Sequence, residues 1–171
     1  MKAERKHWKI KLKEISKPER INFSMQFTDE QFEKITNGLI PQEMEDKWFI
    51  FYENNWLYFH RSWTGYCQYK MQITKAEDEP NYTIKEFFVE RNPDIYRGVN
   101  DYEEIERLCF IILYGLLGFE ECKNHLLNDA KSAIELIKAW SNFGNMKINK
   151  NDHSEKQDEF NLLSKNRCGR N

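Results

Sequence analysis

Alternating apolar and polar positions predict an antiparallel sheet in the middle of the chain. Strongly apolar runs flank the pair Asn54-Asn55, which is typical of a two-residue hairpin turn because asparagine tolerates positive φ. Shorter alternating runs precede and follow this hairpin. The predicted strands are residues 8–12, 47–53, 56–60, 66–74 and 83–91.

The two-residue turn also predicts the register of the hairpin. Glu53 should pair with Trp56, and Trp48 with Arg61. Both faces of the hairpin are then apolar, so we expect it to lie centrally in the sheet. His60 and Arg61 would point to opposite faces, which argues against the two side chains gripping one ligand together.

Helices are predicted before and after the sheet. Thr28 begins a short helix, because Gln31 completes a capping box and Asn37-Gly38 provides the stop signal. Asn100 or Asp101 caps a helix that runs to about Leu117 and is apolar around most of its circumference. A second long helix is predicted over residues 120–140.

These elements predict an α+β fold: an antiparallel four- to five-stranded sheet with two long C-terminal helices packed on one face. The N-terminal helix would guard the other face or an edge. We expect one domain over residues 1–143. Residues 144–171 are mostly polar and are interpreted as a flexible tail.

The amino-acid composition excludes several classes of function. The net charge is -2 and the isoelectric point is about 6.1, which argues against nucleic-acid binding. Eight Lys and Arg residues against three Glu in the first 20 residues are interpreted as a solvated face. The longest apolar run, 12 residues, is too short for a membrane span. No signal peptide is visible, so a cytoplasmic location is expected.

The turn His-Arg-Ser-Trp-Thr-Gly at residues 60–65 is the candidate ligand site. Arg61 offers a bidentate fork for phosphate, and Ser62 and Thr64 offer hydroxyl donors. Three aromatic side chains could stack on a base or sugar, namely Trp63, Trp48 and Tyr66. In the structural alternative, Arg61 pairs with Glu45 or Asp46 and Trp63 fills the core.

The sequence evidence for catalysis or metal binding is weaker than the evidence for a ligand site. His60 is the candidate general acid or base, with Asp46 or Glu45 to orient it, and Ser62 lies on the same strand face. No recognisable oxyanion hole accompanies them. Scattered histidines and cysteines predict no metal site, and the chain has no glycine-rich nucleotide loop, so no cofactor is expected.

The segments Met-Glu-Asp-Lys-Trp-Phe (residues 44–49) and Leu-Tyr-Phe-His-Arg-Ser-Trp-Thr-Gly (residues 57–65) resemble the core of a small family of uncharacterised bacterial proteins. The resemblance extends through Arg91-Asn92 and the helix after Asn100, about half of the chain. It implies a loose association with ADP-ribose metabolism and assigns no catalytic residue.

Three function hypotheses follow. The first is a small cytosolic module that binds a phosphorylated nucleotide or ADP-ribose-type ligand through the turn at residues 60–65. The second is an enzyme that acts on such a ligand with His60 as acid or base. The third is a protein-interaction module of the inhibitor or immunity type, which would bind a protein partner.

Overall fold

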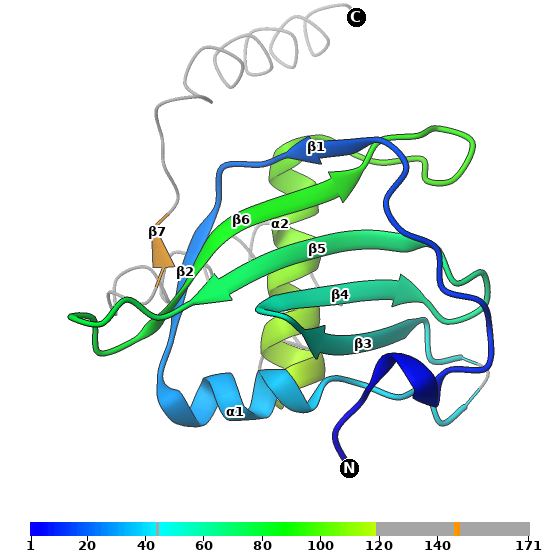
Figure 1. Cartoon of the computed structure of the whole chain (residues 1–171). Coiled ribbons are helices and arrows are strands. Elements are labelled where there is room, and N and C mark those ends of the chain that lie inside the picture. The colour runs from blue at the N-terminus through cyan, green and yellow to red at the C-terminus, as the bar shows by residue number, and fades with distance from the viewer. Residues whose placement is uncertain (44, 119–145, 148–171) are drawn as a thin grey trace, which may run out of the picture.

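The fold is α+β (Figure 1), as given by a computed structural model that describes residues 1–43, 45–118 and 146–147. The chain is rich in aromatic residues. The strands pair antiparallel in the order β3-β4-β5-β6-β2-β7, and β1 also pairs with β6. Their bounds are Pro18–Arg20 (β1), Ser24–Phe27 (β2), Trp48–Glu53 (β3), Trp56–Arg61 (β4), Cys67–Thr74 (β5), Tyr82–Glu90 (β6) and Met146–Lys147 (β7).

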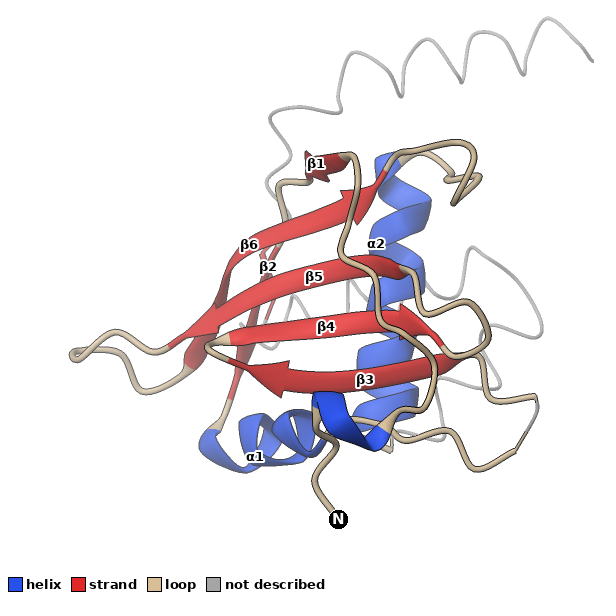
Figure 2. Ribbon diagram, turned by 45° about the vertical axis from the view of Figure 1, so that its right-hand side comes forward, coloured by secondary structure: helices blue, strands red, loops and turns tan. Residues whose placement is uncertain are grey.

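One long helix packs on one face of the sheet. Helix α2 (Asp101–Phe110) continues as the π-helical turn η2 (Ile111–Leu116), and Figures 1 and 2 show it crossing behind the strands. Its buried side chains, among them Ile105, Leu108 and Ile112, join the main core with residues of β3 to β6. Helix α1 (Asp29–Asn37) lies along the β3 edge.

The opposite face of the sheet is covered by the chain itself. Residues 1–15, here called the N-terminal strap, include the short helix η1 (Arg5–His7) and run across the front of β3 to β5 in Figure 2. The strap encloses a small second core with Phe49 and Phe51, against which Trp8 packs. Lys13 fastens it: its N–H donates to the Gly65 carbonyl at 2.9 Å, and its carbonyl accepts from Cys67 at 3.0 Å.

Several local predictions are confirmed. The hairpin register matches in all its pairs, from Trp48 opposite Arg61 to Glu53 opposite Trp56. Asn54 and Asn55 have φ of 52° and 67°, as the turn requires. The capping box of Thr28 and Gln31 is present at the start of α1, and Asn100 caps α2.

The expected sheet of four to five strands with two long C-terminal helices packed on it is wrong. Six strands lie between Pro18 and Glu90, and β7 adds to the β2 edge. Residues 8–12 are not a strand: next to them, Lys13 makes a single parallel bridge with Tyr66, and the segment serves as part of the strap. The described residues contain one long helix.

The second predicted helix, residues 120–140, lies outside the described residues. Most of the predicted tail, residues 144–171, also lies outside them, although Met146–Lys147 pairs with Ser24 and Met25 of β2. No helix in the described ranges has the length and apolar character to cross a membrane.

Candidate functional site

A cavity of about 500 Å³ opens between the β4–β5 end of the sheet and helix α2. It is called the Arg61–Arg107 cavity here. Three cationic side chains line it, and the described residues contribute no carboxylate to the lining. The lining consists of Lys47, Trp48, Arg61, Thr64, Gln68, Tyr69, Ile95, Tyr96 and Arg107.

Arg61 is held in the cavity without an acidic partner. It follows Phe59 and His60 at the end of β4, and its guanidinium lies 5.1 Å from the centroid of the Trp48 ring. Within the described residues it forms no ion pair with a carboxylate. Partial burial lowers the pKa of Arg61, which reflects the cost of keeping this cation away from water.

The predicted structural partners of Arg61 are engaged elsewhere or exposed. The Asp46 carboxylate accepts hydrogen bonds from the backbone N–H groups of Gln42, at 2.8 Å, and Glu43, at 3.1 Å. These bonds lower the pKa of Asp46 and fix the loop before β3. Glu45 is exposed and makes no ion pair within the described residues. The guanidinium of Arg61 is therefore available to an anion.

A buried carboxylate holds the wall of the cavity in place. Glu104 Oε2 accepts hydrogen bonds from the hydroxyls of Tyr69, at 2.6 Å, and Tyr96, at 2.9 Å. Arg91 donates to the other oxygen, Oε1, at 3.3 Å, and Arg107 donates to the Tyr96 hydroxyl at 2.7 Å. Burial raises the pKa of both tyrosines, so they remain protonated hydrogen-bond donors.

The residues of the predicted turn do not act together. Arg61 and Thr64 line the cavity, as does Trp48 from the partner strand. The Ser62 hydroxyl is buried and donates a hydrogen bond to the Asp46 carbonyl at 2.6 Å, so it stabilises the loop before β3. Trp63 is 61% exposed and does not fill the core.

Tyr66, the last predicted stacking residue, lies outside the cavity lining. The ammonium of Lys13 in the N-terminal strap sits 3.8 Å from the centroid of its ring. This ring face is therefore used by a cation–π contact within the protein. The aromatic surface in the cavity comes instead from Trp48, which also has the cation–π contact with Arg61, and from Tyr96. Of these two residues only Trp48 was predicted.

His60 lies on the strap side of the sheet. Its ring is fully buried and stacks on Phe51 at 5.6 Å between centroids. Nδ1 lies 2.9 Å from the Gly65 carbonyl oxygen, an acceptor, so the proton is on Nδ1. Nε2 has no hydrogen-bond partner among the described residues. Burial lowers the pKa of His60, and the ring does not line the Arg61–Arg107 cavity.

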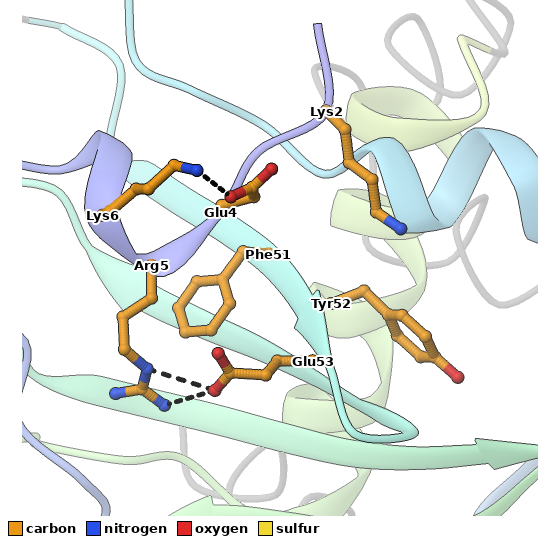
Figure 3. Close-up of a pocket in the computed structure, with 7 residues that line it drawn as sticks. All are labelled: Lys2, Glu4, Arg5, Lys6, Phe51, Tyr52 and Glu53. Carbon is orange, nitrogen blue, oxygen red and sulfur yellow. Dashed lines mark hydrogen bonds and ion pairs between the residues drawn. The ribbon is translucent and has the colours of Figure 1, made fainter.

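A second cavity, of about 600 Å³, lies between η1 and β3 (Figure 3). Three cations, Lys2, Arg5 and Lys6, line it together with the carboxylates of Glu4 and Glu53. Arg5 forms an ion pair with Glu53 at 3.2 Å, and Lys6 forms one with Glu4 at 2.7 Å. Because the two carboxylates offset most of this positive charge, the second cavity is a weaker anion site than the Arg61–Arg107 cavity, which has three cations and no carboxylate in its described lining.

Sequence reasoning missed Gln68, Tyr96 and Arg107. Nothing in the local pattern marks them, because they come from a strand, a loop and a helix that meet only in the folded chain. In the described ranges, no group of three or more His, Cys, Asp or Glu side chains could hold a metal ion. Comparison with protein-family models, curated proteins and solved structures finds no match to this chain.

Proposed function

We propose that the protein is a binding module for a small phosphorylated molecule of the nucleotide type, held in the Arg61–Arg107 cavity. One observation carries this proposal: the guanidinium of Arg61 has no acidic partner among the described residues and shares a cavity with Lys47 and Arg107. A partly buried cation that lacks a counter-charge favours an anionic ligand.

The chemistry of the lining suits phosphate and a planar group together. Guanidinium groups bind phosphate oxygens in a bidentate manner, and Arg61 and Arg107 enter the cavity from the sheet and from α2. Thr64 adds a hydroxyl donor, and Trp48 and Tyr96 offer aromatic surface. A volume of about 500 Å³ is in the range of small-molecule sites.

ADP-ribose is one member of this ligand class. The resemblance of residues 44–49 and 57–65 to a family loosely associated with ADP-ribose metabolism makes it a natural early probe. The residues that line the cavity require only that the ligand carry a phosphate group and a planar ring.

Ligand-induced thermal shift, followed by titration calorimetry, tests the proposal. The probes are pyrophosphate, ADP and ADP-ribose. We expect the wild-type protein to bind at least one of them, and Arg61→Gln and Arg107→Gln each to weaken that binding. A charged hydrogen bond contributes about 1.5–3 kcal/mol, which corresponds to roughly a tenfold to hundredfold change in affinity.

Arg20→Gln is the matched control, because it removes the same charge from β1, which pairs with β6 and does not line the cavity. It should leave the affinity unchanged. The proposal is wrong if none of the three anions binds the wild-type protein. It is also wrong if binding survives in both Arg61→Gln and Arg107→Gln.

The enzyme alternative has less support, because His60 faces the N-terminal strap and does not line the cavity. Recovery of the bound probe in intact form would count against it. The protein-interaction alternative is favoured by one observation, the 61% exposure of Trp63. It requires a partner whose binding is lost in Trp63→Ser and retained in Arg61→Gln.

A further inference from the structure

An irregularity in the sheet places two consecutive side chains in the Arg61–Arg107 cavity. In β5, Tyr69 pairs with Phe59 and Cys67 pairs with His60, so Gln68 is an extra residue opposite no partner. Regular alternation would send Gln68 and Tyr69 to opposite faces, yet both line the cavity. A β-bulge commonly redirects a side chain in this way beside a functional site.

The side-chain amide of Gln68 has no hydrogen-bond partner among the residues that the structure describes. Gln68 is only 8% exposed, and its side chain makes no hydrogen bond within residues 1–43, 45–118 and 146–147. Neither amide atom is among the fully buried polar atoms that lack a partner, so both are reached by the water of the cavity, where a ligand can take the place of that water. The other polar groups near it, such as the Tyr69 and Tyr96 hydroxyls, are used by Glu104.

The hydrogen-bonding groups of a glutamine amide limit which ligands can bind to it. The group presents one carbonyl acceptor beside one NH₂ donor, in one plane. Its complement is a planar group with an amino donor next to a ring-nitrogen acceptor. Adenine has that edge, and a glutamine amide binds it in a bidentate manner.

We infer that Gln68 makes the Arg61–Arg107 cavity selective for an adenine-type base, with the phosphate of the same ligand on Arg61 and Arg107. This inference rests on the proposed function. Arg61 and Arg107 supply most of the affinity for the anion, and Gln68 decides which base accompanies it.

Titration calorimetry with three monophosphates tests the inference. The probes are adenosine monophosphate, purine riboside monophosphate, which lacks the amino group, and ribose phosphate, which lacks the base. We expect the wild-type protein to prefer adenosine monophosphate over the other two by about tenfold or more. In Gln68→Leu, which keeps a similar volume, the preference over purine riboside monophosphate should disappear.

Gln72→Leu is the matched control, since Gln72 lies on the same strand, pairs with Trp56 and does not line the cavity. It should keep the preference. The inference is overturned if the wild-type protein binds all three monophosphates equally, or if Gln68→Leu retains the preference. If Gln68→Leu does not fold, the affinities of the wild-type protein for the three monophosphates test the inference on their own.

Failure of the inference and failure of the proposed function can be told apart. If the three monophosphates bind equally and Arg61→Gln weakens all of them, the anion site stands and the base selectivity is wrong. If no phosphate binds the wild-type protein, the proposed function fails and the inference fails with it.

Discussion

Tyr69 and Glu104 join the centre of the sheet to helix α2, because the Tyr69 hydroxyl donates a 2.6 Å hydrogen bond to Glu104 Oε2. Glu104 is fully buried and also accepts hydrogen bonds from Arg91 and from the backbone of Val99. This single carboxylate therefore ties β5, the loop before α2 and α2 itself into one unit behind the Arg61–Arg107 cavity.

Removing the Tyr69 hydroxyl should destabilise the fold. In Tyr69→Phe the buried carboxylate loses a short hydrogen bond, and we expect the free energy of unfolding to fall by about 1–3 kcal/mol. Urea denaturation measures the change. Tyr58→Phe is the control, because the half-buried Tyr58 hydroxyl makes no hydrogen bond within the described part of the chain. An equal loss in both variants would contradict the role given to Glu104.

Gly65 cannot accept a side chain where the N-terminal strap crosses the sheet. Its φ is +71°, and an added Cβ would lie 2.2 Å from the Lys11 carbonyl oxygen. We expect Gly65→Ala to lower the melting temperature by several degrees and to loosen the strap. Gly115→Ala is the comparison: its nearest contact would be Ile111 at 4.0 Å, and alanine favours a helix. It should be neutral or stabilising in the same calorimetric scan.

His60 should make the protein less stable in mild acid. Its folded pKa lies below the ordinary value of 6.5, because burial disfavours the charged ring. The unfolded chain then binds the proton more readily, so this stability is complete above about pH 6.5 and is lost as the pH falls toward the folded pKa. Glu14 opposes this shift, and Arg5 adds to it.

Urea denaturation between about pH 7 and pH 5 measures this dependence. His60→Asn keeps a donor toward the Gly65 carbonyl and removes the titrating ring, so its stability should change less with pH than that of the wild type. His7→Gln, in η1, should retain the wild-type dependence. A wild-type slope that persists in His60→Asn would assign the effect to another group.

Trp8 should protect the thiol of Cys67. The indole stacks on Phe49 at 5.4 Å and donates to the Ser62 carbonyl at 3.0 Å, which holds the strap over the second core. Burial raises the pKa of Cys67 to about 12, so little reactive thiolate forms at neutral pH. We expect Trp8→Ala to cost about 2–3 kcal/mol and to speed alkylation of Cys67, followed by peptide mass spectrometry.

Trp63→Ala is the control for this substitution, since its side chain is 61% exposed. It should change both the stability and the alkylation rate much less. Equal rates in the two variants would show that the strap does not shield Cys67.

The hairpin could be predicted in detail because its geometry is local. Two asparagines with positive φ fix the turn, and the turn fixes the pairing of Trp48 with Arg61. The same reasoning correctly separated His60 from Arg61, which now lie on the strap side and the cavity side. Capping by Thr28 and Asn100 is similarly local and was also predicted.

Strand β2 was missed although a signal was present, whereas β1, whose three residues are all exposed, carries no such signal. Every second residue from Ile21 to Phe27 is buried, with polar residues between them. This alternation is typical of a strand, but the short run lies directly before a well-capped helix. The cavity was harder to predict, because the bulge at Gln68 breaks the alternation that strand prediction assumes.

The placement of the N-terminal strap has a consequence for the order of folding. Residues 1–15 are synthesised before the strands they cover, β3 to β5, which span Trp48 to Thr74 and leave the ribosome later. Lys13 cannot pair with Gly65 and Cys67 until the β4–β5 connection exists. The N-terminal strap therefore cannot dock until these later strands have paired, and closure of the second core is a late, long-range step of folding.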